Sequence, residues 1–389
     1  SFRKMQLRVL LLLPPFAKAA CDLTRGKWVR DDDYYHKAIQ HYKQCSPKNA
    51  IRPTSRQCGN SHLAWRWQPD RCKLPPLEVR WFQHFTSTHT ISFVGDSLAG
   101  DQFTSMDCLL SAREAFFWKR EYHKLPFLVD EDYYPASSIK TAFLKSRKDE
   151  AALCMRSYRR RQITANCTID AVIVHLRNAQ RISTYARSFR RVLVLNAGHH
   201  FGHEKLNVWF NYSKGPSRWS DLVEADKSAP KDDERHPSKA WEVALSTVLQ
   251  ATQSPKWNSF TVLQTVSPSH YAGGGWRDGG SCGATEPASS IGESYRKEFD
   301  AQRRAADAFM RKTTNAAKHV RVLDVFNVSA LRPDAHPGRY GELRPGVRDC
   351  SHWCLPGVPD VWNQFLQHTL RCRACANGGK CRPAYVQDC

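Results

Sequence analysis

A short apolar run that ends abruptly in a serine is the feature that most restricts the fold of this chain. Residues 91–94 read Ile-Ser-Phe-Val, and Gly95, Asp96 and Ser97 follow at once. An apolar stretch at 103–110 comes next, so a buried strand, a polar turn and a helix succeed one another. That order is typical of a parallel sheet covered by helices, and open sheets of this kind place their sites at the carboxyl ends of the strands.

Alternating strands and helices continue along the chain. Further strands are predicted at 171–176, 192–195, 261–266 and 320–326, and further helices at 240–250 and 294–314. Residues 202–238 are rich in Lys, Ser, Pro and Asp, which predicts a long surface loop. We therefore expect one α/β domain over residues 91–370, with a central, mostly parallel sheet flanked by helices.

Three flanking segments differ in composition from this region. Residues 1–20 carry basic residues before a short apolar run, as in a signal peptide or the remnant of a signal-anchor, and the run is too short to span a bilayer. Residues 21–90 are rich in cysteine and tryptophan, which predicts a smaller, loop-rich lobe stapled by disulfides and packed on the main domain. Residues 371–389 form a cysteine-rich tail. We expect attachment to a membrane only through an N-terminal anchor.

The chain is strongly basic, since 58 Lys and Arg against 37 Asp and Glu leave a net charge of +21. Such a charge suits polyanionic partners, although a solvated basic surface is the alternative. The 14 cysteines and the glycosylation sequons at Asn166, Asn211 and Asn327 indicate an oxidising, glycosylating compartment. We therefore expect acidic glycans rather than nucleic acid as the polyanion.

The chain offers the groups of a nucleophilic serine site. A serine hydroxyl needs an imidazole to take its proton and a carboxylate to orient that imidazole. Asp349 and His352 lie three residues apart, with Cys350 between them and Cys354 after His352, and they could serve Ser97 in this way. Asn196 and Gly198 follow a neighbouring strand, and with the backbone N–H of Ser97 they could stabilise an oxyanion. We expect no metal in this site.

Each short motif is weak alone, because a capped turn and a surface histidine would explain it equally well. Together, in the order Gly-Asp-Ser, Asn-x-Gly, Asp-x-x-His at strand ends, they resemble the SGNH hydrolase and acyltransferase superfamily. Longer blocks, which extend over residues 21–370, look like the trichome birefringence-like family of plant-type polysaccharide O-acetyltransferases. These blocks include Trp-Arg-Trp-Gln-Pro at 65–69, Thr-Val-Ser-Pro-Ser-His at 265–270, Leu-Arg-Pro-Asp-Ala-His-Pro at 331–337 and the run at 349–363.

This resemblance implies a three-layer SGNH-like fold and a two-step acetyl transfer. Ser97 would be the nucleophile, His352 the general base and then acid, and Asp349 the orienting carboxylate. Asn196, Gly198 and the Ser97 backbone would form the oxyanion hole. An acetyl group would pass through an acyl-serine to a hydroxyl of a cell-wall or extracellular polysaccharide. The resemblance also implies a membrane-anchored protein of the Golgi lumen, with secretion as the alternative.

The implied reaction needs an acetyl donor but no bound cofactor. No nucleotide-binding glycine motif occurs, so acetyl-CoA is one candidate among several acetylated carriers. The chain departs from the family at Gly100, Asp101 and His200, and at Gln264, which stands where an arginine is common. These departures leave the acceptor glycan open, whether xylan-like, acidic or other.

The family further implies the pairing of eight cysteines. These pairs are Cys21–Cys72, Cys45–Cys108, Cys58–Cys354 and Cys282–Cys350. The last two would bracket His352 and clamp the segment that carries it. Cys154 and Cys167 could pair locally, and the cysteines of the tail could form two disulfides or a zinc site, with disulfides favoured in a secretory lumen. The tail cysteines are Cys372, Cys375, Cys381 and Cys389.

Candidate substrate contacts are aromatic, imidazole and carboxylate side chains near the predicted site. They are Asp96, Trp67, His199, His200, His270, Trp276 and Trp353. Trp67 could line a sugar-binding groove or simply pack. Trp276 lies in a glycine-rich loop whose backbone must approach another group closely. His270 and His336 could instead be structural hydrogen-bonding residues.

Two other functions remain compatible with this sequence. A carbohydrate acetyl esterase would use the same three side chains but transfer the acetyl group to water. A non-catalytic protein could keep the fold and bind acidic polysaccharide through its basic surface.

Overall fold

The structure is a computed structural model, and it describes most of the α/β region and its N-terminal lobe. The described residues are 22–37, 58–86, 89, 91–111, 119–123, 141–145, 153–156, 169–173, 192–196, 208–210, 222–224, 249, 260–276, 279–312, 319–343 and 345–376.

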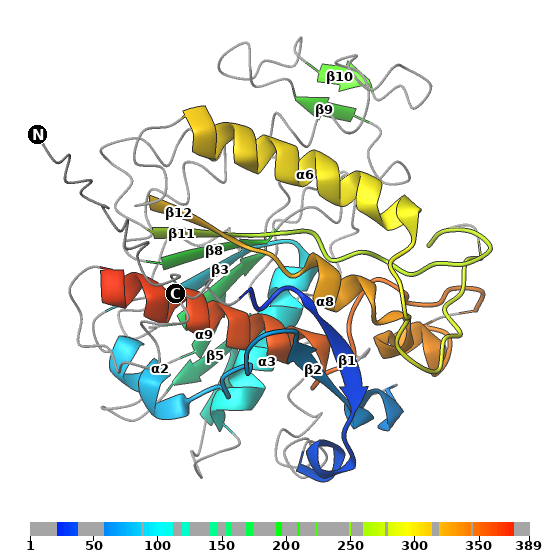
Figure 1. Cartoon of the computed structure of the whole chain (residues 1–389), viewed down its shortest axis with the longest axis horizontal. Helices are drawn as coiled ribbons and strands as arrows, with labels where there is room; N and C mark the ends of the chain where they lie inside the picture. The colour runs from blue at the N-terminus through cyan, green and yellow to red at the C-terminus, as the bar shows by residue number, and fades with distance from the viewer. Residues whose placement is uncertain are drawn as a thin grey trace, which may run out of the picture.

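An eight-stranded sheet forms the centre of the molecule (Figure 1). The strand order across it is β12-β11-β8-β3-β7-β6-β5-β4. Neighbours from β12 to β6 are parallel, whereas β5 pairs antiparallel with β6 and with β4. The strands are β3 (Ile91–Gly95), β4 (Lys119–His123), β5 (Thr141–Lys145), β6 (Leu153–Arg156), β7 (Ile169–Ile173), β8 (Val192–Asn196), β11 (Phe260–Gln264) and β12 (Val320–Leu323). The predicted, mostly parallel sheet is confirmed.

The central position of β3 explains where a site can form. It lies between β7 and β8, and the chain places β6 and β7 on one side of it before β8, β11 and β12 on the other. A crevice opens at the carboxyl ends of the strands at such a reversal. The strands β8 and β11 are buried along their whole length, as expected for parallel strands covered on both faces.

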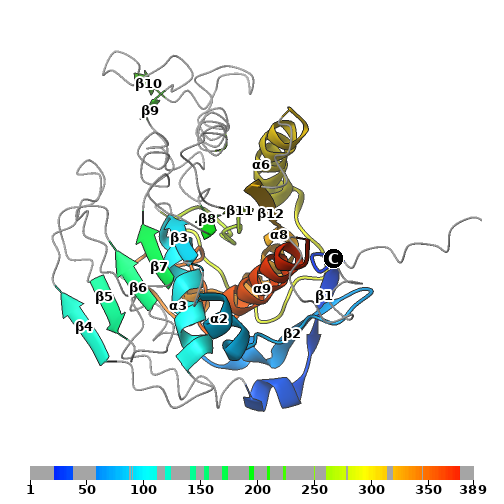
Figure 2. The same ribbon diagram turned by 90° about the vertical axis from the view of Figure 1, so that its left-hand side faces the viewer.

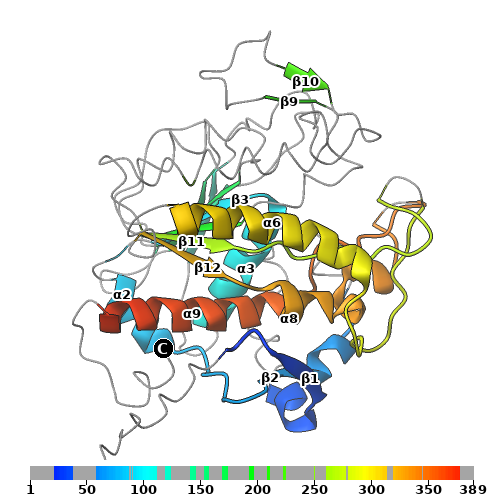
Figure 3. The same ribbon diagram turned by 45° about the horizontal axis from the view of Figure 1, so that its top comes forward.

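Helices cover both faces of the sheet (Figure 2). One face is covered by α6 (Glu293–Lys312), and the opposite face by α3 (Ser97–Ser111) and α9 (Val358–Ala376), which pack against each other. Figure 3 shows α6 and α9 on opposite sides of β11 and β12. This arrangement confirms the three-layer prediction, and α9 continues past residue 370 into the predicted tail.

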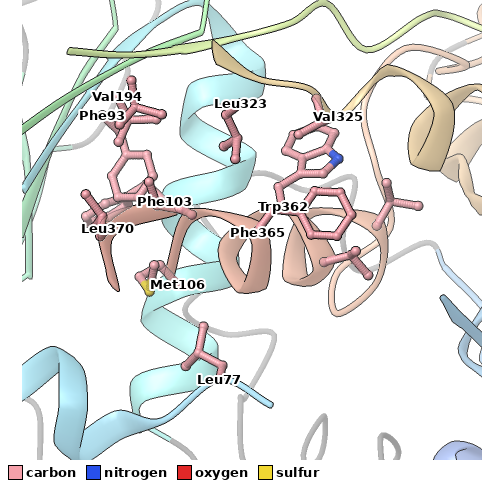
Figure 4. Close-up of a cluster of buried hydrophobic side chains, with 14 of the residues drawn as sticks. Leu77, Phe93, Phe103, Met106, Val194, Leu323, Val325, Trp362, Phe365 and Leu370 are labelled. Atoms are coloured by element: carbon pink, nitrogen blue, oxygen red, sulfur yellow. The ribbon is translucent and has the colours of Figure 1, made fainter. Parts of the chain in front are cut away.

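The main core lies between the sheet and the pair α3–α9 (Figure 4). Phe93 of β3 meets Phe103 of α3 edge to face, with ring centroids 6.2 Å apart. From α9, Trp362 and Phe365 fill the centre of the same cluster, and the Trp362 indole N–H donates to Ser329 Oγ at 3.0 Å. Each large apolar side chain buried here contributes about 1.5–3 kcal/mol, so this cluster fixes α3 and α9 against the strand ends.

The N-terminal lobe contains regular structure, contrary to the prediction of a loop-rich segment. Strand β1 (Gly26–Arg30) pairs antiparallel with β2 (Trp65–Pro69), which follows the 3-10 helix η3 (Ser61–Ala64) and precedes α2 (Val79–Thr86). The Trp28 indole N–H donates to the carbonyl of Val328 at 3.0 Å and ties this two-stranded sheet to the main domain. Local patterning missed the sheet because its two strands lie far apart in the sequence.

Two predicted boundaries need correction. The strand predicted at 320–326 ends at Leu323, because the Asp324 carboxylate accepts a hydrogen bond from Phe326 N–H at 3.0 Å and a helix begins there. The predicted loop 202–238 contains a small antiparallel pair. The helix that begins there is α8 (Phe326–Ala330), and the 3-10 helices η7 (Pro333–Ala335) and η8 (Pro337–Arg339) follow it. The antiparallel pair in the predicted loop consists of β9 (Val208–Phe210) and β10 (Leu222–Glu224).

Other predicted segments lie outside the described residues. They are 1–20, the helix at 240–250 apart from Leu249, and the tail beyond Ala376. Among the helices that the structure describes, none is both long enough and apolar enough to span a membrane.

Candidate active site

The turn between β3 and α3 carries the predicted nucleophile. The Asp96 carboxylate accepts a hydrogen bond from Leu98 N–H at 2.9 Å and so caps the first turn of α3. The backbone N–H of Asp96 donates to the carbonyl of Asn196 at 3.2 Å, which joins this turn to the end of β8. Ser97 is therefore the first residue of a helix at the centre of the sheet's carboxyl edge, where the helix dipole favours negative charge.

Gly95 is required by the close approach of β3 to β8. A Cβ at this position would lie 1.5 Å from the carbonyl oxygen of Asn196. No side chain fits such a gap without moving one of the two strand ends. The glycine of the Gly-Asp-Ser motif thus sets the distance between the serine and the neighbouring strand.

The strip 349–354, which has no helix or strand, carries the predicted base and its orienting carboxylate. His352 Nδ1 lies 2.8 Å from Asp349 Oδ2 and 3.0 Å from Oδ1. Asp349 Oδ1 also accepts hydrogen bonds from the backbone N–H groups of Ser351 and His352 at 3.2 and 3.0 Å. These donors hold the carboxylate still and fix the plane of the imidazole.

The second ring nitrogen of His352 completes the arrangement. His352 Nε2 lies 2.7 Å from Ser97 Oγ, although 255 residues separate the two in sequence. The hydroxyl can donate its proton to Nε2 because Asp349 holds the proton of Nδ1 on the other side. The structure thus brings together Ser97, His352 and Asp349 in the geometry that serine activation requires.

The environment of Asp349 keeps it ionised. Its side chain is 1% exposed, and burial alone would raise its pKa. Electrostatic attraction to the His352 ring and the hydrogen bonds from this ring and from two backbone N–H groups outweigh burial and hold the pKa of Asp349 well below its usual range. An ionised Asp349 is the form that stabilises a developing imidazolium.

Asn196 supplies an unused donor beside the serine. It ends β8, in register with Gly95 of β3, and is 2% exposed. Its Nδ2 has no hydrogen-bond partner among the residues that the structure describes. Buried amide donors rarely stay unpaired unless a ligand or water completes them, so this N–H group fits a donor to an oxyanion. Gly198, His199 and His200 lie outside the described residues.

Two disulfides clamp the strip at either side of His352. Cys58 pairs with Cys354, and Cys282 pairs with Cys350. Both pairs are those that the family resemblance implied. They tie the strip to the N-terminal lobe and to the glycine-rich loop, so the base depends on contacts far away in the sequence.

The remaining cysteine pairings lie wholly or partly outside the described residues. Cys72 is disulfide-bonded, but its predicted partner Cys21 is not described. For the predicted pair Cys45–Cys108, neither Cys45 nor the side chain of Cys108 is described. Cys372 is also disulfide-bonded, which favours disulfides over zinc in the tail. Neither Cys154 nor Cys167 is described at the side chain.

Three predicted substrate contacts are corrected by their burial. Trp67 is 1% exposed in the core, and its indole N–H donates to the carbonyl of Leu23 at 2.9 Å. Trp353 is equally buried and donates to Ser267 Oγ at 2.9 Å. His270 is 5% exposed, with both ring nitrogens facing protein atoms. These rings therefore present no face to a sugar.

Other predicted positions have mixed outcomes. Asp96 is buried and acts as the helix cap described above, whereas Trp276 is half-buried in the glycine-rich loop and stays a candidate substrate contact. The Asn327 side-chain amide, to which a glycan would be attached, donates to the carbonyl of Thr24 at 3.3 Å. Asn166 and Asn211 lie outside the described residues.

Sequence reasoning missed a link between the helix and the strip. Asp101 lies one helical turn after Ser97, and its carboxylate accepts a hydrogen bond from the backbone N–H of Trp353 at 3.4 Å. The signal available in the sequence was this spacing of four residues, which places Asp101 on the same face of α3 as Ser97.

A cluster of His, Cys, Asp and Glu suited to a metal ion is absent from the described part of the chain. What the described residues do bring together is a serine hydroxyl, an imidazole, a carboxylate and a buried amide donor. Such a set can form and resolve an acyl-serine.

Comparison with known proteins supports this chemistry. A family model, PC-Esterase, described as a GDSL/SGNH-like acyl-esterase family found in Pmr5 and Cas1p, matches residues 74–369. Protein trichome birefringence-like 41 of Arabidopsis thaliana is 30% identical over 389 residues, which cover 94% of this chain and 95% of that protein. Xyloglucan O-acetyltransferase 2 of the same plant is 26% identical over 400 residues, which cover 95% and 87%.

Proposed function

We propose that this chain, which belongs to the PC-Esterase family of GDSL/SGNH-like acyl-esterases, is a polysaccharide O-acetyltransferase. The observation that carries this proposal is the 2.7 Å contact of His352 Nε2 with Ser97 Oγ, with Asp349 on the other ring nitrogen. The name of one relative, a xyloglucan O-acetyltransferase, supports a cell-wall polysaccharide as the acceptor.

The first half-reaction loads the serine. His352 Nε2 takes the proton of Ser97 Oγ as the oxygen bonds to the acetyl carbonyl carbon of the donor. The tetrahedral oxyanion would then accept hydrogen bonds from Asn196 Nδ2 and the backbone N–H of Ser97. When the bond from the acetyl carbon to the carrier breaks, His352 returns the proton to the departing carrier, and acetyl-Ser97 remains.

The second half-reaction transfers the acetyl group. A sugar hydroxyl gives its proton to His352 Nε2 and attacks the carbonyl carbon of acetyl-Ser97. The bond to Ser97 Oγ breaks, and the proton moves from His352 back to this oxygen. Asp349 stays ionised throughout and stabilises the imidazolium that forms twice in each cycle.

The acetyl donor is proposed only as a class. Any activated acetyl ester or thioester, acetyl-CoA among them, fits the chemistry of the first step. The chain's own residues provide binding, proton transfer and oxyanion stabilisation, and the donor supplies the acetyl group.

A transfer assay tests the proposal. The protein is incubated with an acetylated donor and a panel of cell-wall glycans, and acetyl-glycan and free acetate are both quantified. We expect acetyl-glycan in excess of acetate with at least one glycan and no product with Ser97→Ala. The exposed Ser61→Ala is the matched control and should keep full activity. Release of acetate alone, in the presence of every glycan, would contradict the transferase.

An acetyl esterase is the second candidate, and the description of the family as acyl-esterases favours it. Both enzymes would form the same acetyl-serine and differ in whether water reaches it. A non-catalytic glycan-binding protein is the third candidate, for which Ser97→Ala would leave glycan binding unchanged and no acetyl-serine would form.

We also propose that the protein acts in the Golgi lumen. The two disulfides beside His352 support an oxidising compartment, because such bonds persist there and are rare in the cytosol. Fractionation of expressing cells, with protease protection of the lumenal side, tests this location.

A further inference from the structure

Two buried histidines lie directly behind the strip 349–354. His270 follows β11, and His336 lies between η7 and η8. They are 5% and 0% exposed, and their ring centroids are 4.9 Å apart. Neither takes part in the proton transfers proposed above, so a pair of titratable side chains beside the site has no assigned role.

The pair is hydrogen-bonded to the main chain of the proposed base. His336 Nδ1 lies 2.7 Å from the carbonyl oxygen of His352, and His336 Nε2 lies 2.7 Å from His270 Nδ1. His270 Nε2 lies 3.0 Å from the carbonyl oxygen of Ala330, at the end of α8. An unbroken row of contacts therefore leads from α8 through both rings to His352.

Counting protons assigns the direction of these bonds. Burial lowers the pKa of His336 to about 3 and that of His270 to about 4, so both rings are neutral near pH 7. Two neutral rings carry two N–H groups for three contacts. One of the three contacts therefore lacks a proton and is repulsive. Repulsion is strongest at the shortest distance, which assigns the N–H groups to the two contacts of 2.7 Å and leaves bare the His270 Nε2, 3.0 Å from the carbonyl oxygen of Ala330. His336 then donates to His352, and His270 donates to His336.

Packing prevents either ring from turning away. The Trp353 ring lies over His336 with centroids 4.2 Å apart, and Trp353 is itself held by its bond to Ser267. Tyr295 of α6 meets His270 edge to face at 5.0 Å. All four ring nitrogens face protein atoms, which leaves none to bind a ligand.

The bond from His336 completes the immobilisation of His352. The backbone N–H of His352 donates to Asp349, its ring Nδ1 contacts the same carboxylate, and its carbonyl accepts from His336. The peptide groups on both sides of this residue are thus fixed. A small rotation of either would carry Nε2 away from Ser97 Oγ, and misplacement by about 1 Å can lower a rate roughly 100-fold.

We propose that His336, held in its donating tautomer by His270, is a positioning residue that fixes the His352 main chain and so holds Nε2 against Ser97. This role rests on the proposed function, because it concerns the same base. It adds two residues to the machinery of the site, neither of which touches substrate.

The test compares His336→Asn with His336→Leu. The asparagine amide can donate to the His352 carbonyl from nearly the position of Nδ1, whereas leucine has a similar size and no donor. The readout is the rate at which Ser97 reacts with a fluorophosphonate probe, followed by kcat and KM for acetyl transfer. We expect His336→Leu to lower the labelling rate and kcat roughly 100-fold without changing KM, and His336→Asn to keep most of both.

His62→Leu is the matched control for a merely structural loss. His62 is equally buried, and its Nε2 lies 2.9 Å from the carbonyl oxygen of Pro356, two residues past the strip. The His62→Leu variant should have a lower melting temperature than the unmodified chain but a labelling rate close to that of this chain. Equal rates for His336→Leu and His336→Asn would overturn the positioning role, as would an equal loss of rate in His62→Leu.

A second measurement needs no variant. Nitrogen-15 NMR of the intact protein should show His336 protonated at Nδ1 and bare at Nε2 near pH 7. The opposite tautomer would overturn the role even if the leucine variant failed to fold. If the unmodified chain does not react with the probe, the proposed function itself fails, and this role fails with it.

Discussion

The two halves of the site are held in place by different means. Ser97 lies where β3 meets α3, and the regular hydrogen bonds of the sheet and the helix fix its backbone. His352 lies in the strip 349–354, which has neither helix nor strand and is held by two disulfides and by side chains from distant segments.

This difference predicts different vulnerabilities. The serine side depends on main-chain geometry, so it should fail only when the backbone is forced to move. The base side depends on single side chains, and it should fail when one of them is lost while the sheet remains folded.

Asp349→Asn should cause the largest loss, because an asparagine cannot stabilise the imidazolium and favours the wrong tautomer of His352. We expect kcat/KM for acetyl transfer to fall roughly 10,000-fold, with an unchanged circular dichroism spectrum. Asp32→Asn, whose carboxylate is 73% exposed, is the control and should leave the rate unchanged. A loss below about tenfold for Asp349→Asn would show that the strip does not carry the base.

Gly95→Ala should break the serine side through its backbone. The added Cβ would meet the carbonyl oxygen of Asn196, so the ends of β3 and β8 must separate. We expect the free energy of unfolding, measured by urea denaturation, to fall by at least ~2 kcal/mol, together with activity. Gly283→Ala is the matched control, since a Cβ there meets no atom within 4 Å. Equal stabilities of the two variants would contradict this explanation.

Removing either disulfide beside His352 should loosen the strip 349–354 while the sheet stays folded. The pairs are Cys58→Ala with Cys354→Ala, and Cys282→Ala with Cys350→Ala. Each should lower kcat, and each should cost about 2–4 kcal/mol of stability. The bond from Cys58 closes 296 residues and that from Cys282 closes 68, so the first loss should be the larger by about 1 kcal/mol. Unchanged kcat in both variants would mean that the strip needs no clamp.

Acid should lower the stability of the fold through the buried histidines behind the strip 349–354, by less than the loss of a disulfide does. Burial lowers the pKa of His62, behind Pro356, to about 4. Burial also lowers the pKa values of His270 and His336. Each folded value lies below the unfolded value of about 6.5, so unfolding takes up protons, and stability falls as the pH drops below 6.5. From pH 7 to 6 each histidine costs about 0.7 kcal/mol.

Asp360 opposes this loss from the helix side of the site. Burial raises its pKa to about 7, above the unfolded value, so it adds stability as the pH falls from 7. Its carboxyl group accepts from Ser105 Oγ of α3. The net loss from pH 7 to 6 is about 1 kcal/mol, measurable by urea unfolding at both pH values. A gain in stability at pH 6 would contradict the assignment of three neutral histidines.

The same contrast explains what could be predicted from the sequence. The turn at Ser97 could be predicted because an apolar strand, a glycine and a helix start are local signals. The roles of Asp349 and His352 came from their motif and from the family that it resembles. In each case the informative residues lie close together in the chain.

Long-range contacts explain what sequence reasoning missed. Trp67 lies in the core because β2 pairs with β1, some 40 residues earlier. The sequence pattern within either strand does not predict that pairing. Trp353 and His270 look like surface groups until Ser267 and His336 are placed against them. Whether an amphipathic ring is buried depends on residues from distant segments, which the neighbouring sequence does not reveal.

The proposed mechanism requires Ser97 to carry the acetyl group. The most direct test is peptide mass spectrometry of the protein after exposure to an activated acetyl ester without acceptor. We predict one acetyl group on Ser97, which disappears when an acceptor glycan is added and is recovered on the glycan. The absence of acetyl-Ser97, or labelling that persists in Ser97→Ala at the same rate, would contradict the account.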